Sequence, residues 1–395
     1  MSSTSQWRNS KLRSRVASAA LSFLVAFAAG LTSTQTAQAQ TFTVLYNFRG
    51  PQSDGGNPWA GLIQDEASNL YGTTTTGGPG GYGVIFELDT AGAETVLHYF
   101  TGSDGASPVS NLLRDSSGTL YGTALGGASG YGVVFQLSTT GTMTVLHSFT
   151  GDDGCYPQGA VIMNAKGILY GTASGCGAYG GGTVWKLNQS GKLTVMHNFA
   201  GGGQDGWSPN YATLLMDKHG NIYGFASEGG ASDAGVVYKL TSSGQLTVLY
   251  SFAGGSTDGC GPLGAPVMDG KGNLYGTAGC GAYDFGVVWK LSDTGAETVL
   301  HNFTGEPWDG EYPYVGVIRD KAGNLYGTTE FGGPSDYGTV WELSKSGTQS
   351  VLQSFAGFSG AWVYSSVLRD ASGGLYGTAS YGGTIGYGTV WRVTP

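Results

Sequence analysis

A three-residue phrase, Leu or Ile followed by Tyr-Gly, recurs seven times in this chain. Its tyrosines are Tyr71, Tyr121, Tyr170, Tyr223, Tyr275, Tyr326 and Tyr376. They are spaced 49 to 53 residues apart and cover most of the sequence. A fixed period of this length indicates a repeat architecture, in which each copy is one supersecondary unit that cannot bury its apolar face alone. The repeat therefore assigns most residues to the fold and leaves few that carry chemistry.

The sixth copy contains four short segments with the composition of β-strands. They span residues 315–320, 324–329, 337–343 and 350–355, and are rich in Val, Leu, Thr and aromatic residues. Gly, Asn, Asp and Ser separate them, which is typical of turns between strands. Residues 40–395 show no helical period. Four antiparallel strands in each of seven copies predict an all-β protein, a seven-bladed β-propeller; a right-handed β-solenoid is the alternative.

The two ends of the repeat region complete each other. The seventh copy stops after its third strand, at residues 388–393, and residues 43–48 have the pattern of the missing fourth strand. Pairing these segments closes the ring and leaves no free sheet edge. We therefore expect one domain over residues 40–395. Its blades 1 to 7 span about 58–100, 108–149, 157–199, 209–252, 262–303, 313–355, and 363–395 plus 43–48.

The first 39 residues have the layout of a secretory signal peptide. Four basic residues precede an apolar stretch at 16–29, and Ala37-Gln38-Ala39 is a small-x-small cleavage site. The stretch is short for a membrane span, so a cleaved leader is favoured over an uncleaved anchor. No later segment reaches membrane-spanning length. We expect a secreted or periplasmic, extracytoplasmic protein.

The charge balance limits the partners of this chain. Without the leader's four basic residues, 14 Lys and Arg face 27 Asp and Glu, a net charge of −13. An acidic chain without basic clusters argues against nucleic acid and anionic membranes as partners. With nucleic acid and membranes disfavoured, we expect the partner to be a glycan or a surface protein. We expect the protein itself to be a monomer.

Three recurring phrases resemble a known family. They are Gly-Asn-Leu-Tyr-Gly-Thr at 323–328, Gly-Thr-Val-Trp at 338–341 and Thr-Val-Leu-His-Asn-Phe at 298–303. The pattern is similar to the bacterial GloVer (Gloeo-Verruco) tandem repeat of secreted choice-of-anchor proteins, and covers about residues 42–395. The resemblance implies a secreted repeat protein with no established activity. The C-terminal sorting anchor often found in such proteins is not matched here, which leaves surface attachment open.

The blade also resembles the broader group of NHL-like β-propellers. That resemblance implies that residues 315–320 form the innermost strand of a blade and residues 350–355 the outermost. One aromatic recurs in every third strand and one Phe in every fourth. The third-strand set is Phe86, Phe135, Trp185, Tyr238, Trp289, Trp341 and Trp391. The fourth-strand set is Phe48, Phe100, Phe149, Phe199, Phe252, Phe303 and Phe355. We expect both sets to pack between blades.

Four cysteines occur in two matching pairs. Cys155 and Cys260 each precede their marker tyrosine by fifteen residues, while Cys176 and Cys280 follow it by six and five. The third and fifth copies therefore have both positions, and the other copies have neither. This co-occurrence predicts disulfides Cys155–Cys176 and Cys260–Cys280, each joining two loops on one face of the ring. Free buried thiols are the alternative, and zinc is less favoured because no Cys-x-x-Cys occurs.

An Asp-Gly-x-x-Pro motif lies before the innermost strand of six blades. Its aspartates are Asp54, Asp104, Asp153, Asp205, Asp258 and Asp309, and the seventh copy reads Ser359-Gly360-Ala361-Trp362-Val363. A ring of carboxylates suits calcium or a cationic ligand. Because the motif is in six blades, we favour an Asx-type turn with the proline fixing the start of the inner strand. No cofactor is expected, and calcium is left without further support.

Four histidines share one position in the outermost strands. They are His98, His147, His197 and His301, and Tyr46, Tyr250 and Gln353 replace them in other blades. Three strand spacings separate them from the inner ring, so neighbouring equivalents should lie roughly 15–20 Å apart. We expect them to be rim residues that do not share a metal.

Blade-specific aromatics mark the candidate ligand face. The face with two long loops per blade should carry any site. Its aromatics are Trp59, Tyr156, Trp207, Trp308, Tyr312, Phe331, Phe358 and Trp362. Aromatics beside Asp and Gly suit stacking on sugars; the alternative is that they cap loops or the channel.

Acidic residues that depart from the repeat are the candidates for catalysis. Glu228 and Glu330 are the strongest, although blade 5 separates them, and Asp233, Glu306 and Glu311 are weaker. No nucleophile elbow, phosphate-binding glycine loop or His-Glu-x-x-His motif occurs. The favoured hypothesis is a secreted, non-catalytic protein that binds a glycan or protein on its loop face. The alternatives are an extracellular polysaccharide hydrolase or lyase, and a structural cell-envelope module.

Overall fold

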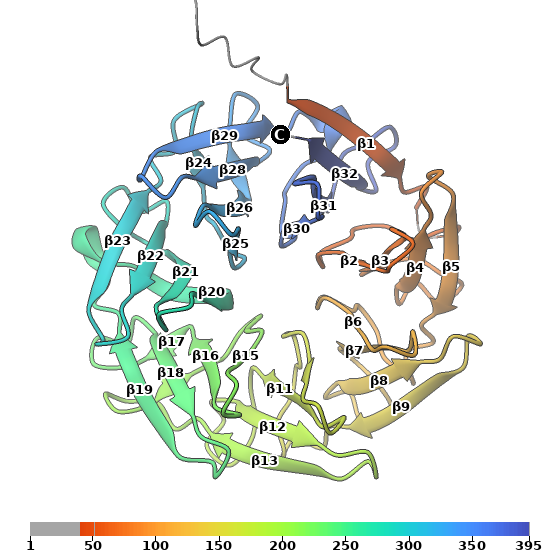
Figure 1. The fold of residues 1–395 in the computed structure, drawn as a ribbon. Coiled ribbons are helices and arrows are strands. Elements are labelled where there is room, and N and C mark those ends of the chain that lie inside the picture. The colour runs from red at the N-terminus through yellow and green to blue at the C-terminus, as the bar shows by residue number, and fades with distance from the viewer. Residues whose placement is uncertain (1–39, 51, 395) are drawn as a thin grey trace, which may run out of the picture. The chain divides into compact units, whose positions relative to one another are not determined.

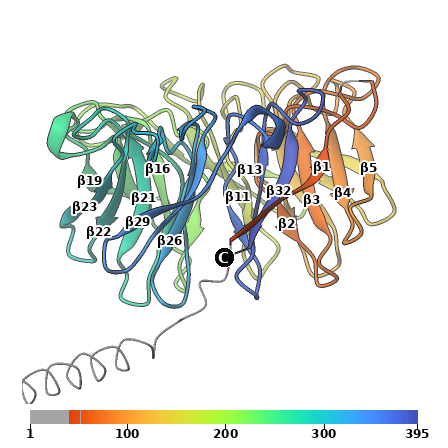
Figure 2. The same ribbon diagram turned by 90° about the horizontal axis from the view of Figure 1, so that it is seen from above.

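Seven four-stranded antiparallel sheets form a closed ring in the computed structural model (Figure 1). The structure describes residues 40–50 and 52–394. The predicted signal peptide, residues 1–39, lies outside the described residues. In the side view of Figure 2 the strands run between the two faces of the ring. Within the described residues, no helix is long and apolar enough to span a membrane.

The strands of each blade follow one another from the channel outward, innermost first. Blade 1 is β2 (Ile63–Gln64), β3 (Leu70–Thr74), β4 (Val84–Leu88) and β5 (Glu94–Tyr99). Blade 2 is β6 (Leu113–Arg114), β7 (Leu120–Ala124), β8 (Val133–Leu137) and β9 (Met143–Ser148). Blade 3 is β10 (Ile162–Met163), β11 (Leu169–Ala173), β12 (Thr183–Leu187) and β13 (Leu193–Asn198). Blade 4 is β15 (Leu215–Met216), β16 (Ile222–Ala226), β18 (Val236–Leu240) and β19 (Leu246–Ser251).

The remaining blades follow the same order. Blade 5 is β20 (Cys260–Met268), β21 (Leu274–Gly279), β22 (Val287–Leu291) and β23 (Glu297–Asn302). Blade 6 is β25 (Ile318–Arg319), β26 (Leu325–Thr329), β28 (Thr339–Leu343) and β29 (Gln349–Ser354). Blade 7 is β30 (Leu368–Arg369), β31 (Leu375–Ala379), β32 (Thr389–Thr394) and β1 (Thr41–Asn47). The loops contain two short two-stranded ribbons, β14 (Gly206–Trp207) with β17 (Glu228–Gly229) and β24 (Gly310–Glu311) with β27 (Phe331–Gly332). They also contain two 3₁₀ turns, η1 (Gly255–Thr257) and η2 (Gly357–Ser359).

The predicted ring closure is confirmed. Strand β1 pairs with β32, with Thr41 opposite Thr394 and Asn47 opposite Thr389. The first strand of the ring thus completes the last blade, and the solenoid alternative is wrong. The innermost strands are shorter than expected. They have two residues each except β20, which has nine.

The recurring aromatics pack between blades, as predicted. Each outermost-strand Phe contacts the third-strand aromatic of the next blade. The seven pairs are Phe48–Phe86, Phe100–Phe135, Phe149–Trp185, Phe199–Tyr238, Phe252–Trp289, Phe303–Trp341 and Phe355–Trp391, with ring centroids 5.1 to 5.8 Å apart. All fourteen rings are at most 1% exposed. Because these ring contacts recur at every junction, including the one between blades 7 and 1, they hold the ring together.

The marker phrase has a packing explanation. Gly327 pairs with Trp341 across strands β26 and β28, and a Cβ at Gly327 would lie 2.4 Å from the indole ring. Only glycine leaves room for the aromatic beside it. The hydroxyl of Tyr326 donates to Asp320 Oδ2 at 3.2 Å, which ties the second strand to the turn before it. Five other marker tyrosines donate to an aspartate in the same way, and Tyr170 contacts Asn164.

The motif proline contributes to the junctions as well. A Cβ at Gly286 of blade 5 would lie 2.4 Å from Pro313 Cδ of blade 6, so glycine and proline fit against each other across the junction. Beside this contact, Thr277 Oγ1 donates to Val315 O at 2.9 Å. The segment leading into each inner strand is therefore fixed by the preceding blade. These segments line the channel, so the junctions position whatever side chains follow the proline.

Candidate functional site

Two disulfides identify the face of the ring that carries the long loops. Cys155 bonds to Cys176 and Cys260 to Cys280, each with a Cα–Cα distance of 5.3 Å. The predicted pairing is confirmed. Each bond joins the start of the segment that forms the inner strand, where Cys260 is the first residue of β20, to the loop between the second and third strands of the same blade. These loops therefore lie on one face, called the loop face below, and the tight turns lie on the other.

The motif aspartates belong to the rim of the ring. Asp205 accepts hydrogen bonds from Ala200 N at 2.9 Å and from His197 Nε2 at 3.0 Å. Each pair joins the outermost strand of one blade to the loop before the next blade. The other histidine pairs are His98–Asp104, His147–Asp153 and His301–Asp309. Tyrosine replaces histidine in Tyr46–Asp54 and Tyr250–Asp258. The predicted Asx-type turn is wrong in detail. Each carboxylate accepts from a backbone N–H upstream and from the outer-strand side chain, and so closes the end of the outer strand.

The single blade junction without this pair changes both partners together. Gln353 stands at the His position and Ser359 at the Asp position. Gln353 donates to Ser354 O, and Ser359 Oγ accepts from Ala356 N at 2.9 Å. The histidines are therefore structural partners of the motif. Within residues 40–50 and 52–394, no group of three or more His, Cys, Asp or Glu side chains is arranged to hold a metal ion.

A cavity of about 540 Å³ occupies the channel at the centre of the ring. Every blade contributes to its wall one residue that follows the motif proline or its equivalent. These residues are Trp59, Val109, Gln158, Tyr211, Leu263, Tyr314 and Tyr364. In blade 4 the side chain is the second after the proline, and in the others it is the first. The position therefore recurs in every blade while its side chain varies from blade to blade.

Four aromatic rings line this central cavity. Trp59 and Tyr364 stack with centroids 4.3 Å apart and an interplanar angle of 15°. The ring centroid of Tyr211, which comes from the opposite part of the propeller, lies 6.4 Å from that of Trp59. Tyr314 lies on the same wall and is 37% exposed. Flat rings that face an open cavity are surfaces on which another ring can stack.

One carboxylate lines the central cavity among the described residues. Glu330 follows strand β26 directly, and no other blade has an ionisable residue at this position. Its side chain is buried, 8% exposed, and accepts a hydrogen bond from the Tyr364 hydroxyl. Burial raises the pKa of Glu330 above its ordinary value, although the Tyr364 hydrogen bond opposes that shift. Burial, followed by the bond to Glu330, raises the pKa of Tyr364.

An aromatic strip continues from the cavity wall over the loop face of blades 6 and 7. It consists of Tyr314, Tyr312, Phe331, Trp362 and Tyr381. Successive ring centroids are 5.7, 6.1, 6.5 and 4.6 Å apart. Tyr312 and Trp362 hold left-handed backbone, with φ of 56° and 57°. A bulky residue seldom adopts this conformation, but the position before the motif proline or its equivalent is left-handed in all seven blades, so this backbone belongs to the repeat.

The structure places some of the predicted ligand-face aromatics in the central cavity or the aromatic strip and the others outside both. Trp59 lines the central cavity, while Tyr312, Phe331 and Trp362 belong to the aromatic strip. The other four are elsewhere. Tyr156, Trp308 and Phe358 are 50%, 78% and 78% exposed and lie outside both the central cavity and the strip, and half-buried Trp207 packs on the glycines at 180–181 of blade 3.

The structure does not bring the predicted acidic residues together. Glu330 lines the central cavity, whereas Glu228 is exposed in ribbon β14–β17, opposite Trp207. Asp233 Oδ1 accepts a bond from Gly229 N at 2.9 Å, a turn contact. Glu306 and Glu311 are on the loop before blade 6, outside the cavity wall.

Sequence reasoning missed Tyr211, Tyr314 and Tyr364. The signal was present in the residue after each motif proline, which varies although the motif is constant. The pairing of Glu330 with Tyr364 had no such signal, since it joins neighbouring blades across 34 residues.

Comparisons with known proteins place the chain in one family. The Gloeobacter/Verrucomicrobia repeat model matches residues 23–215 and 161–391, which confirms the resemblance noted in the sequence. A search of curated protein sequences finds no match.

The chain is similar to several solved structures at low sequence identity. The extracellular domain of a proposed one-component system from B. thetaiotaomicron is 11% identical, with a TM-score of 0.54, over 88% of this chain and 39% of that one. A gluconolactonase from Xanthomonas campestris is 16% identical, with a TM-score of 0.43, over 70% of this chain and 82% of that one. A proposed 6-phosphogluconolactonase from Bacteroides fragilis is 16% identical, with a TM-score of 0.49, over 76% and 84% of the two chains. At 11% identity, the likeness to the first of these structures concerns the fold alone.

Proposed function

We propose that this chain, which belongs to the Gloeobacter/Verrucomicrobia repeat family, is an extracytoplasmic glycan-binding protein. A terminal sugar enters the central cavity, and the units that follow lie on the aromatic strip. The observation that carries this proposal is the continuity of the two surfaces, since Tyr314 belongs to both. Two disulfides favour an oxidising compartment outside the cytoplasm.

The dimensions of the central cavity suit such a ligand. Its volume of about 540 Å³ falls within the usual range for small-molecule pockets. The stacked pair Trp59–Tyr364 offers an apolar face to a sugar ring. Polar groups that line the same cavity, including Gln158, Asn111 and Thr213, suit the hydroxyls at the edge of that ring.

Binding is favoured over hydrolysis because of the chemistry of the acidic groups. Glycoside hydrolysis generally uses two carboxylates that flank the scissile bond. The described wall of the central cavity supplies Glu330 alone, and its best predicted partner, Glu228, lies outside the cavity. A buried carboxyl with a raised pKa beside a tyrosine hydroxyl is suited to hydrogen-bond a sugar hydroxyl.

A glycan array followed by calorimetry on the strongest ligand tests this proposal. Trp59→Ala should weaken binding at least tenfold, because it removes half of the stacked pair. Trp362→Ala should weaken binding of long glycans more than of short ones, since it lies farther along the strip. Trp308→Ala is the matched control. It removes an equally large ring, 78% exposed on the same loops, and should leave affinity unchanged.

Two results would contradict the proposal. One is equal loss of binding in the Trp59 and Trp308 variants. The other is release of shorter saccharides from a bound glycan, abolished by Glu330→Gln, which would establish the hydrolase or lyase alternative instead.

A further inference from the structure

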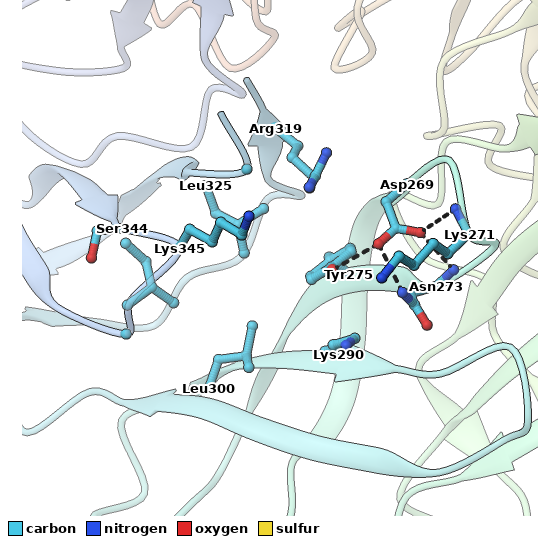
Figure 3. Close-up of a pocket in the computed structure, with 13 residues that line it drawn as sticks. Asp269, Lys271, Asn273, Tyr275, Lys290, Leu300, Arg319, Leu325, Ser344 and Lys345 are labelled. Atoms are coloured by element: carbon cyan, nitrogen blue, oxygen red, sulfur yellow. Dashed lines mark hydrogen bonds between the residues drawn. The ribbon is translucent and has the colours of Figure 1, made fainter. Parts of the chain in front are cut away.

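A second cavity opens on the opposite face of the ring, where the tight turns lie. It has a volume of about 350 Å³ and lies between blades 5 and 6. Figure 3 shows Lys271 and Lys290 of blade 5 on one side and Arg319 and Lys345 of blade 6 on the other. We call this the basic cavity. Its apolar wall is formed by Leu300, Leu325 and Leu343.

The four cations of the basic cavity have almost no counter-charge. Asp269 is the one carboxylate on the described wall, and it is occupied by its own turn. It accepts bonds from Lys271 N, Asn273 N and Asn273 Nδ2 at 2.8 to 3.0 Å, and from the Tyr275 hydroxyl at 3.1 Å. None of the four cationic side chains forms an ion pair with another described residue. Three net positive charges thus remain in a chain that is acidic as a whole.

Arg319 has an unpartnered donor at this place. Its Nε atom is buried and lacks a hydrogen-bond partner within the described part of the chain, and its guanidinium lies 5.7 Å from the centroid of Tyr275. Stacking on the tyrosine fixes the plane of the guanidinium. A guanidinium held in a fixed orientation is the usual protein group for bidentate recognition of an oxyanion.

The other blade junctions show that this charge is not required by the fold. The position of Arg319 is held by Met163, Met216 and Met268 in three blades, and by Gln64 in another. Where arginine recurs, at Arg114 and Arg369, the facing third-strand residue is Glu87 or Glu342. The junction of blades 5 and 6 alone combines Arg on one strand with Lys on the other.

The turn residues repeat the same pattern. The position of Lys345 is held by Thr90, Thr139, Gln189, Ser242 and Asp293 in blades 1 to 5. The position of Lys271 is Ala, Ser, His or Lys in the other blades. Four cations gathered at one of seven equivalent junctions raise the local positive potential at a cost in self-repulsion, which an anionic ligand relieves.

We propose that the basic cavity binds one oxyanionic group, a carboxylate or a phosphate or sulfate ester, carried on a small body such as a sugar ring. Arg319 and Lys290 hold the oxyanion, while Lys271 and Lys345 complete the charge at the opening. The leucine wall contacts the body of the ligand. This site is separate from the central cavity and shares no residue with it.

Calorimetry at low ionic strength tests the site with four probes: inorganic phosphate, glucose 6-phosphate, glucuronate and neutral glucose. The three anions should bind to the purified protein, and glucose should not bind at this site. Equal affinity for phosphate and glucose 6-phosphate means that the anion alone is recognised. Tighter binding of glucuronate means that a sugar acid is the preferred form.

The chain supplies substitutions that other blades already tolerate. Arg319→Met and Lys290→Glu introduce residues found at equivalent positions in Met216 and Glu342, so the fold should be retained. Their combination should weaken anion binding at least tenfold. Lys186→Glu makes the Lys290 change at the junction of blades 3 and 4 and should leave affinity within twofold of the parent.

The location of binding has an independent readout. In a nitrogen-15 correlation spectrum, the amides of residues 271–275 and 323–325 should shift as phosphate is added. Absence of saturable anion binding would overturn the site. So would equal weakening by Lys186→Glu, or shifts confined to residues away from blades 5 and 6.

Discussion

The blade junctions and the wall of the central cavity come from the same repeat but differ in what they conserve. At the junctions, the side chains are repeated: an aromatic, a Phe, a glycine and a proline recur around the ring and are buried. At the cavity wall, the backbone position is repeated while the side chain changes, from Trp59 to Val109 to Gln158. A closed ring needs seven equivalent contacts, whereas a ligand site needs particular groups from particular blades. Repetition therefore marks structure and departure marks function.

The strongest test of this comparison replaces one large aromatic by alanine in each of the two regions. Trp341→Ala should lower the free energy of unfolding by about 3–5 kcal/mol, because the ring is fully buried between blades 5 and 6. Trp59→Ala should lower it by less than about 1 kcal/mol, since its ring faces the cavity. Denaturant unfolding measures both. Comparable losses at the two sites would break the comparison.

Trp341→Phe refines that result. The indole Nε1 of Trp341 is buried without a hydrogen-bond partner in the described residues, and blades 1 and 2 have Phe at this position. We expect the Phe variant to retain most of the stability that the Ala variant loses.

Removal of a disulfide should have the next largest effect. Cys155→Ser with Cys176→Ser opens a loop with a sequence separation of 21 residues and should cost about 3 kcal/mol. The other five blades hold the same loops without a disulfide, so the ring should still fold. Thermal unfolding with and without reductant measures the effect, and a reductant-insensitive melting temperature in the parent would contradict it.

The rim pairs should make stability depend on acid. Burial opposes ionisation of Asp205 and Asp309, but the hydrogen bonds and charges of His197 and His301, together with backbone N–H donors, outweigh it and lower the pKa of each carboxyl. A lowered pKa in the folded state adds stability above the ordinary aspartate value, and this stability is lost as pH falls through the folded-state value. The melting temperature should therefore fall as the pH is lowered from about 5 to about 2, a range that brackets the reference pKa of aspartate.

Replacing one His–Asp pair by the Gln353 and Ser359 combination measures what that pair contributes to stability. His197→Gln with Asp205→Ser should cost about 1–2 kcal/mol at pH 7 and almost nothing below the folded-state pKa of Asp205. A loss that is independent of pH would assign the pair a packing role.

The smallest expected effect is a gain in stability. Burial, with the charge of Asp258, raises the pKa of Glu297 to about 7, and its Oε1 atom lacks a partner in the described residues. Leu193 and Leu246 hold the equivalent position in blades 3 and 4. Glu297→Leu should therefore stabilise the protein by about 1–2 kcal/mol at pH 8, after allowance for solvent screening. The gain should shrink at pH 5, where the parent carboxyl is protonated in the folded state.

Local patterns in the sequence predicted the elements better than the contacts between them. Strand positions, the closing pair β1–β32 and both disulfides follow from spacing within the repeat. The His–Asp pairs were separated in the prediction into rim histidines and turn aspartates, although their joint loss at Gln353 and Ser359 is visible in the sequence. The two residues of each pair are six or eight apart, on a strand and a loop, and no local period links them.

By itself, the sequence determined a seven-fold ring, because a strict period with one strand displaced to the start leaves a closed sheet as the arrangement without a free edge. Tertiary structure decided the sites. The central cavity joins Trp59, Tyr211 and Tyr364, and the basic cavity joins Lys290 to Arg319, from blades that only ring closure or blade packing brings together. The repeat specifies each blade's own contacts. Which variable side chains face one another depends on the order and angle in which the blades pack around the axis.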